Sequence, residues 1–324
     1  MKENNIPLEL IKILSDAEIH SGEQLGERMG MTRAGINKHI QTLRSWGLNI
    51  QTVTGKGYCL PKAINLLSIE AISTYTDNQR IILEPVIDST NQYLLERISE
   101  LASGDVCIAE YQSAGRGRRG RQWVSPFGCN LYLSMYWKLD QGPAAAIGLS
   151  LVVGIILAET LNKLGHVGVR VKWPNDLYLN DKKLAGILVE LTGKTGDAAH
   201  IIIGVGLNIG MDKANLADKE NINQQWASLN ETNISINRNE LAAKIIKSLR
   251  EALLQFEKEG MTPFIERWYK LDNYLNRPVK LLIGEKVITG ISRGINDQGA
   301  LLLQQGDELI PYIGGEISLR SNDS

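Results

Sequence analysis

The spacing of apolar residues changes twice along the chain and predicts three structural units. Over residues 1–64, apolar positions recur at helical spacing and end in a short alternating stretch. Residues 65–270 contain apolar runs typical of buried strands and two long helical patterns, at 148–165 and 239–260. Residues 271–324 contain short strand-like runs between turns rich in Gly, Asn and Asp. We therefore expect a multidomain α+β protein.

The first unit shows start and stop signals for successive helices. Ser21 followed by Gln24 is a capping-box signature for a helix start. Gly30 is expected to end that helix, and Thr32 can cap the next one. An alternating stretch then turns at residues 55–57 and returns. Helices followed by a β hairpin in this order predict a winged helix-turn-helix.

The second and third units differ in strand connection. Many strand-like runs of the second unit follow one another through short turns, so we expect a mixed or antiparallel sheet rather than a doubly wound one. The third unit has the profile of a small β-barrel. The predicted strands of the second unit are residues 81–90, 105–115, 130–137, 169–179, 183–193 and 200–209.

Charge is distributed unevenly within the first unit. The whole chain of 324 residues has a net charge of −1, which argues against a protein that coats nucleic acid. Residues 28–60, however, contain five Lys or Arg and no acid, whereas residues 1–27 contain six acids. A plain three-helix interaction module would mix the signs, so we favour DNA binding. Asn and Gln suit adenine edges, Arg suits guanine and Lys suits phosphate. The candidate DNA contacts are Arg33, Asn37, Lys38, Gln41 and Lys56.

Composition favours a globular protein, at 43% hydrophobic and 22% charged residues. The N-terminus lacks the apolar core of a signal peptide. The stretch Ile147–Leu161 is too short for a membrane span and contains Glu159. Three distant cysteines and four scattered histidines suggest neither disulfides nor a zinc site. We expect a cytoplasmic protein that makes no membrane contact.

The stretch GRGRRGRQW at 115–123 holds four arginines and three glycines. An anion-binding loop, a nucleic-acid patch and a solvated loop all fit this composition. Two other glycine motifs are rejected as nucleotide sites. TGKTG at 192–196 lies between two strands and is best explained as a hairpin turn. GVGLNIG at 204–210 is followed by no helix signal, so its glycines are expected to let a ligand lie against a strand.

Five motifs of the second unit together resemble one family. The set is highly specific and closely resembles the catalytic domain of biotin–protein ligases. Nearly the whole chain resembles the bacterial bifunctional ligases that also repress the biotin operon. The resemblance implies a winged helix at 1–64, a class II synthetase-like catalytic domain at 65–270 and an SH3-like barrel at 271–324. The motifs are DSTN (88–91), QSAGRGRRGRQW (112–123), KWPND (172–176), KLAG (183–186) and GVGLN (204–208).

The resemblance also implies roles for individual residues. Biotin and ATP are the substrates, Lys183 bridges biotin carboxylate and α-phosphate, and Asp176 is the carboxylate suited to Mg²⁺. The loop at 115–121 closes over biotin and its adenylate, so the arginine run is explained as an anion cradle. The implied catalytic residues are Lys183, Arg116 and Arg118. The implied biotin-binding residues are Ser89, Thr90, Asn91, Gln112, Gly115, Arg116, Gly117, Arg118, Trp123, Lys183, Gly186, Leu188, Gly204 and Gly206. The implied residues for ATP and the adenylate are Lys172, Asn175, Asp176, Asn208 and Trp226.

Two features of the sequence leave alternatives open. Residues 211–225 form a longer and more polar loop than the family pattern has, which leaves open how strongly a ligand would order it. Arg119 and Arg121 either face solvent, contact a partner chain or join the anion cradle.

The family resemblance further implies three partners. They are the biotin carboxyl carrier protein of acetyl-CoA carboxylase, operator DNA of the biotin operon, and a second copy of the chain when the adenylate is bound. A lipoyl-type ligase and a biotin-sensing repressor without ligase activity are the alternative functions. KWPND and Lys183 argue against the sensor, because a sensor of biotin alone needs no phosphate-handling groups.

Overall fold

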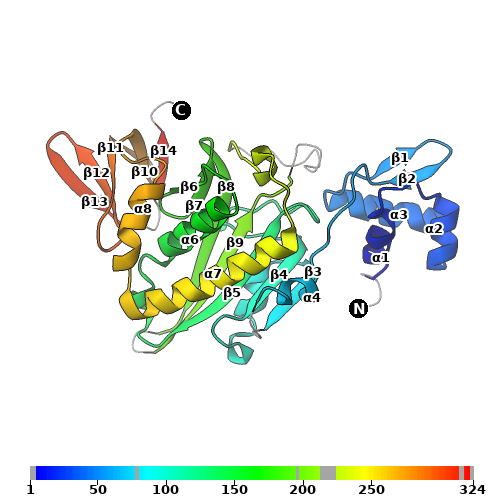
Figure 1. Ribbon diagram of the computed structural model, residues 1–324, viewed down its shortest axis with the longest axis horizontal. Helices are drawn as coiled ribbons and strands as arrows, with labels where there is room; N and C mark the ends of the chain where they lie inside the picture. The colour runs from blue at the N-terminus through cyan, green and yellow to red at the C-terminus, as the bar shows by residue number, and fades with distance from the viewer. Residues whose placement is uncertain (1–4, 77–79, 195–196, 212–223, 314–316, 322–324) are drawn as a thin grey trace.

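The structure of the protein is a computed structural model that describes residues 5–76, 80–194, 197–211, 224–313 and 317–321. Its elements form three groups along the chain (Figure 1). The α-helices are α1 (Asn5–Leu14), α2 (Gly22–Met29), α3 (Arg33–Ser45), α4 (Ile69–Ser73), α5 (Thr90–Leu95), α6 (Leu149–Lys163), α7 (Arg238–Glu259) and α8 (Ile265–Leu271). The strands are β1 (Gln51–Val53), β2 (Gly57–Cys59), β3 (Ile81–Ile87), β4 (Val106–Gln112), β5 (Leu131–Leu139), β6 (Arg170–Lys172), β7 (Asp176–Leu179), β8 (Lys182–Thr192), β9 (Ala199–Leu207), β10 (Pro278–Ile283), β11 (Lys286–Ile295), β12 (Leu301–Gln305), β13 (Glu308–Tyr312) and β14 (Ile317–Ser321).

The N-terminal group is the predicted winged helix-turn-helix. Ser21 and Gln24 form the capping box at the start of α2, each side chain accepting a hydrogen bond from the other's backbone N–H. Gly30 ends α2 in the left-handed conformation, at φ 64°. Thr32 caps α3 by accepting from the backbone N–H of Gly35 at 3.1 Å. The three signals identified in the sequence therefore set the helix boundaries. The helices share a buried core formed by Leu10, Leu14, Leu25, Ile36, Ile40 and Leu43.

The central group is built on a seven-stranded sheet in the order β3-β4-β5-β9-β8-β7-β6. β3 and β4 are parallel, and the other neighbouring pairs are antiparallel, which confirms the predicted mixed sheet. The long helices α6 and α7 cover one face of this sheet (Figure 1). Leu94 of α5 packs with Cys107, Tyr136 and Ile202. Because side chains alternate along a strand, these residues mark the opposite face.

Helix α6 belongs to the core of the central group. Together with a short 3₁₀ turn before it, the helical segment Pro143–Lys163 is 21 residues long and apolar enough to cross a membrane. The stretch at 147–161, expected to be too short for a membrane span, is therefore part of a longer apolar helical segment. Eleven of the fifteen α6 residues are nevertheless buried against other parts of the protein. Its apolar character is explained by the core.

The C-terminal group is an antiparallel sheet in the order β13-β12-β11-β10-β14. This agrees with the strand-rich unit predicted as an SH3-like barrel. Val279, Leu281, Leu301 and Leu303 are buried in the same cluster as the central core. The C-terminal sheet is therefore packed onto the central unit rather than joined to it by a flexible linker.

Several elements were not predicted. Helices α4, α5 and α8 and strand β14 lie in segments to which the sequence pattern assigned no element of that type. The strand predicted over 81–90 ends at Ile87, and α5 begins at Thr90. The strand predicted over 169–179 is two antiparallel strands, β6 and β7, because the chain turns at Trp173–Asn175.

Candidate active site

One cavity brings together most of the predicted ligand-binding residues. It has a volume of about 220 Å³ and lies on the face of the sheet that α5 partly covers. Every predicted catalytic, biotin-binding and ATP-binding residue except Gly115 contributes to its lining. Further lining residues are Arg119, Arg121, Gln122, Val124, Trp173, Pro174, Ile187, Val205, Met211, Gln224 and Gln225.

At one end of the cavity, buried neutral polar groups meet at the start of α5. Ser89 caps this helix, which points Thr90 and Asn91 inward. The backbone N–H and the hydroxyl of Thr90 donate to Gln112 Oε1 at 3.0 and 3.2 Å. Ser134 Oγ lies 2.7 Å from Thr90 Oγ1 and 2.5 Å from Asn91 Oδ1. This arrangement offers oriented donors and acceptors, without net charge, to an uncharged polar ligand group.

Two residues of this end were missed in the sequence. Ser134 interrupts the apolar strand β5, and Glu190 interrupts the apolar run of β8. A single polar residue inside an apolar run is the signal that could have identified both. Glu190 Oε2 accepts from Asn91 Nδ2 at 2.8 Å, and Glu190 Oε1 lies 2.5 Å from Arg116 Nη2.

The wall of the cavity is formed by the Trp123 ring on glycine-bearing strands. Gly186 and Gly206 are paired across β8 and β9. A Cβ atom on Gly206 would lie 2.3 Å from Trp123 Cε2, and one on Gly204 would lie 2.3 Å from Asn91 Oδ1. The glycines were expected to make room for a ligand. They line the cavity and also make room for the side chains of Trp123 and Asn91.

The indole N–H of Trp123 adds a polar feature to this wall. It is buried and has no acceptor among the described residues. Gly115 was expected to touch biotin, but it is absent from the lining of the main cavity. A Cβ on Gly115 would lie 2.3 Å from the Trp123 carbonyl oxygen, so this glycine allows the loop to close on itself.

At the other end of the cavity, cations surround a single carboxylate. Lys183 Nζ lies 2.8 Å from Asp176 Oδ1 and 5.7 Å from the Trp123 ring centroid. Lys172 Nζ donates to Tyr178 Oη at 2.7 Å. Among the described residues that line the cavity, Asp176 is the one carboxylate. Cations therefore predominate, as a phosphate ligand requires.

The arginine loop covers this end. Arg118 Nη1 donates to Asn175 Oδ1 at 3.0 Å, and Asn175 Nδ2 donates to the Ile187 carbonyl at 2.7 Å. Burial, and secondarily Arg119, lowers the pKa of the Arg118 guanidinium. A bound anion would relieve this destabilisation of the charge. Arg119 and Arg121 also line the cavity, which favours their participation in the anion cradle over a purely solvent-facing position.

The backbone beside Lys183 pairs with a separate chain segment. The Lys183 N–H donates to the Gln225 carbonyl at 3.1 Å, and the Ala227 N–H donates to the Lys183 carbonyl at 2.8 Å. This pairing places Trp226 in the lining. Asn208 is buried and its Nδ2 donates to the Ala227 carbonyl at 3.1 Å. Most of the long polar loop at 211–225, residues 212–223, lies outside the described residues.

The five candidate DNA contacts are exposed on α3 and on the turn between β1 and β2. Asn37 Nδ2 also donates to Tyr58 Oη at 3.2 Å, which connects α3 with the hairpin. Arg44 is engaged differently. Its Nη2 donates to the Ile50 carbonyl at 2.8 Å and to Thr52 Oγ1 at 2.7 Å, so it fixes the hairpin to α3.

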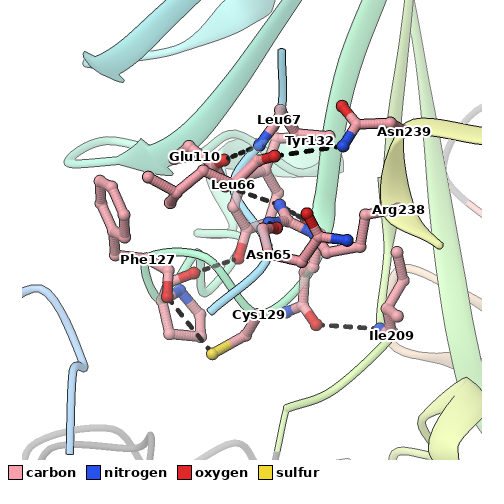
Figure 2. Close-up of polar contacts among 12 residues, drawn as sticks. Asn65, Leu66, Leu67, Glu110, Phe127, Cys129, Tyr132, Ile209, Arg238 and Asn239 are labelled. Atoms are coloured by element: carbon pink, nitrogen blue, oxygen red, sulfur yellow. Dashed lines mark hydrogen bonds and ion pairs between the residues drawn. The ribbon is translucent and has the colours of Figure 1, made fainter. Parts of the chain in front are cut away.

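The segment between β2 and α4 links the N-terminal group to the central unit. A buried polar cluster lies where this linker enters the central unit, and Figure 2 shows its contacts. Arg238 Nη2 donates to Glu110 Oε2 at 2.7 Å and to the Asn130 carbonyl at 2.6 Å. The other carboxylate oxygen of Glu110 accepts from the Leu67 N–H at 2.5 Å. Asn130 Oδ1 accepts from the Ile209 N–H at 2.9 Å. The cluster thus connects the linker to the segment that follows Asn208.

Aromatic rings complete this junction. Trp46, directly after α3, stacks on Tyr111 with ring centroids 5.4 Å apart and on Phe127 at 5.9 Å. The Phe127 N–H donates to the Trp46 carbonyl at 2.8 Å. Tyr111 precedes Gln112 on β4. The winged-helix unit therefore rests directly on a strand that carries a cavity residue.

Comparison with known proteins places these features in a family. The sequence profile of the biotin/lipoate A/B protein ligase family matches residues 83–208. The profile of the biotin protein ligase C-terminal domain matches residues 274–320, and an HTH-domain profile matches residues 8–59. The chain is 64% identical over 321 residues to the bifunctional ligase/repressor BirA of Salmonella typhimurium and, equally, to that of Escherichia coli. Each alignment covers 99% of both chains.

A solved structure shows a corresponding likeness in three dimensions. The biotin protein ligase of Aquifex aeolicus in complex with biotin and ATP superposes with a TM-score of 0.65 at 30% identity. The match covers 75% of this chain and 99% of that one.

Proposed function

Since this chain belongs to the BirA family of bifunctional biotin ligases and repressors, we propose that it activates biotin with ATP and transfers it to a carrier protein. A carboxylate oxygen of biotin attacks the α-phosphorus of ATP, and pyrophosphate leaves. A lysine amine of the acceptor then attacks the acyl carbon of biotinyl-5′-AMP, loses a proton and releases AMP. The proposed acceptor is the biotin carboxyl carrier protein of acetyl-CoA carboxylase.

The polarity gradient of the cavity is the observation that best supports this proposal. The neutral cluster of Thr90, Asn91 and Gln112 suits the ureido head of biotin, whose N–H groups and carbonyl need partners of both kinds. The Trp123 face suits its apolar body. The cationic end suits the triphosphate. A ligand whose head lies in the neutral cluster would direct its carboxylate toward Lys183, in the cationic end.

Lys183 is the residue we assign to charge stabilisation at the reacting oxygens. Its ammonium group is oriented by Asp176 and by the backbone pairing on either side of it. Arg116 and Arg118 add positive charge from the loop, and Lys172 and Asn175 complete the phosphate end. Positive groups already oriented toward developing negative charge lower the barrier without reorganisation.

Asp176 fits a magnesium site that is completed by substrate. Mg²⁺ typically takes one or two carboxylates together with substrate phosphates and water. The Asp176 carboxylate lies at the phosphate end of the cavity beside Lys183. Bound there, Mg²⁺ would neutralise phosphate charge.

For the second activity, we propose that the winged helix binds operator DNA of the biotin operon in the cytoplasm. The acid-free surface of α3 and the hairpin supports this assignment. One winged helix reads one half-site, so a two-fold dimer formed by the adenylate-bound protein is the binding species. Biotinyl-5′-AMP is then the corepressor, and unmodified carrier protein relieves repression by consuming it.

One experiment separates the proposed function from its alternatives. Purified protein is incubated with ATP, Mg²⁺, a biotin-accepting carrier domain and either biotin or lipoate. Biotin-dependent release of pyrophosphate and AMP, together with a mass gain of one biotinyl group on the carrier, is expected. Modification with lipoate alone would identify a lipoyl ligase. Biotin binding without any pyrophosphate release would identify a sensor.

A further inference from the structure

Glu190 lies on β8 and contacts two parts of the site that are far apart in sequence. Its Oε1 atom is 2.5 Å from Nη2 of Arg116, in the arginine loop. Its Oε2 atom accepts a hydrogen bond from Nδ2 of Asn91, at the start of α5, at 2.8 Å. The Glu190 side chain is 20% exposed, so water screens these contacts only in part. One carboxylate therefore joins the loop to the neutral polar cluster.

The contact with Asn91 determines which atom that amide presents. A carboxylate only accepts hydrogen bonds, so Asn91 must face Glu190 with its NH₂ group. Its oxygen then faces Ser134 Oγ at 2.5 Å. With two lone pairs, this oxygen can also accept an N–H of a bound ligand. Reversing the amide would place two acceptors against each other at Glu190.

The contact with Arg116 fixes the loop to the sheet. Arg116 Nη1 donates to Gln92 Oε1 at 2.8 Å, while Nη2 pairs with Glu190. Both partners lie outside the loop, on α5 and β8. A guanidinium group has five N–H donors, so these two contacts leave capacity for an anionic ligand. The Arg116 side chain is 40% exposed, so burial contributes little to fixing its position.

We infer that Glu190 is a positioning residue that makes ureido recognition and loop closure depend on the same carboxylate. This inference rests on the proposed ligase function. Glu190 sets the Asn91 amide for the ligand head and holds Arg116 over the cavity. Binding of biotin and retention of its adenylate are thereby coupled through a group that need not touch either ligand.

Glu190→Gln provides the direct test. Glutamine keeps the size of glutamate, but its NH₂ group faces either Asn91 or Arg116, both of which donate, so one of the two hydrogen bonds is lost. Hydrogen bonds to charged groups are strong enough for about a 10-fold effect. We expect the KM for biotin to rise about 10-fold, and preformed biotinyl-5′-AMP to dissociate about 10-fold faster. The kcat of adenylate formation at saturating substrates should change less than about 2-fold.

A second variant separates positioning from general destabilisation. In an Arg116→Ala background, Glu190→Gln should accelerate adenylate release less than about 2-fold, because the loop contact is already gone. Its effect on the KM for biotin should remain, because that effect acts through Asn91. Glu240→Gln, which breaks the exposed 2.6 Å pair with Lys244 on α7, is the matched control and should change neither quantity.

The outcomes are distinguishable. Wild-type protein that forms no biotinyl-5′-AMP would contradict the proposed function itself. Active wild-type protein with an unchanged KM and release rate in Glu190→Gln would overturn only the role of Glu190. Equal acceleration of release in the presence and absence of Arg116 would also overturn it, since the effect would then be unspecific. Thermal melting confirms that each variant is folded before kinetics are compared.

Discussion

At the scale of single residues, Lys183 shows how sequence and geometry supply different information. Its motif marked it as the bridging cation, while the structure shows its ammonium group between the Asp176 carboxylate and the Trp123 ring. Its main chain is held on both sides by Gln225 and Ala227. A flexible lysine is thereby restricted to one region of the cavity.

Replacing this cation should affect chemistry more than binding. We expect Lys183→Ala to reduce biotin-dependent pyrophosphate exchange by about 10²–10³-fold, a typical loss when one preorganised charge-stabilising group is removed. Lys182→Ala, at the neighbouring position outside the cavity lining, is the control and should retain normal exchange. Exchange near the wild-type rate in Lys183→Ala would contradict the assigned role.

The glycines of β9 give a second residue-scale prediction. A Cβ at position 206 would lie 2.3 Å from Trp123, so Gly206→Ala must displace the indole that forms the cavity wall. We expect the Kd for biotin, measured by calorimetry, to rise at least about 10-fold. Gly154→Ala on α6, whose nearest neighbour atom lies 3.5 Å from the added Cβ, should bind biotin normally. Unchanged affinity in Gly206→Ala would show that Trp123 does not shape the biotin site.

At the scale of elements, helix-capping residues predicted a helix start correctly where no strand-like apolar run came directly before them. Ser21 and Gln24 correctly marked the start of α2. Ser89 and Gln92 carry the same signature for α5, but the apolar run before them extended the predicted strand through it. The family motif DSTN therefore indicated a ligand site, whereas the helix start that orients it was not predicted.

Contacts between distant elements could not be derived in the same way. Arg116 and Glu190 are 74 residues apart and meet only because β8 pairs with β9 and the loop folds across them. The strand order is a tertiary property that hydrophobic spacing does not encode. The family motifs identified most of the cavity, but the glycine roles, Ser134 and Glu190 required the structure.

The winged helix provides an element-scale prediction. Truncation of Arg33, Asn37 or Gln41 to Ala should reduce discrimination between operator and random DNA, at about 1–3 kcal/mol per lost base contact. Lys56→Ala, on the hairpin turn, should weaken binding to operator DNA and to random DNA alike and reduce the salt dependence of binding. Fluorescence anisotropy with both DNAs at several salt concentrations measures these effects. Ligase activity should stay normal, and its parallel loss would contradict separate sites.

At the scale of the whole molecule, the segment before α6 meets the turn between β8 and β9. A Cβ added to Gly142, before α6, would lie 3.2 Å from the Asp197 carbonyl oxygen of the β8–β9 turn. The arginine loop is tied to β8, the first strand of that same hairpin. We propose that ordering of these segments by ligand creates the dimer surface.

Dimerisation should therefore depend on ligand. We expect sedimentation to show tighter self-association with biotin plus ATP, with a coupling of about 1–3 kcal/mol, and operator affinity to rise in parallel. Biotin with an ATP analogue whose α,β-bridging oxygen is replaced by a methylene group is the control, because this analogue cannot release pyrophosphate to form the adenylate. Equal self-association and DNA binding with and without ligands would exclude this switch.

The anchored linker between β2 and α4 determines how the molecule tumbles in solution. Backbone groups of Asn65, Leu66 and Leu67 are held by Arg238, Asn239 and Glu110, and Trp46 is stacked on the central unit. The DNA-binding unit therefore cannot reorient separately, and the protein diffuses as one elongated particle. Time-resolved anisotropy of a dye on the wing should decay with the correlation time of the full chain, and Arg238→Ala should add a fast component. On operator DNA, the spacing of the half-sites must then match the distance between the two winged helices of the proposed dimer, because a rigid linker cannot adjust that distance.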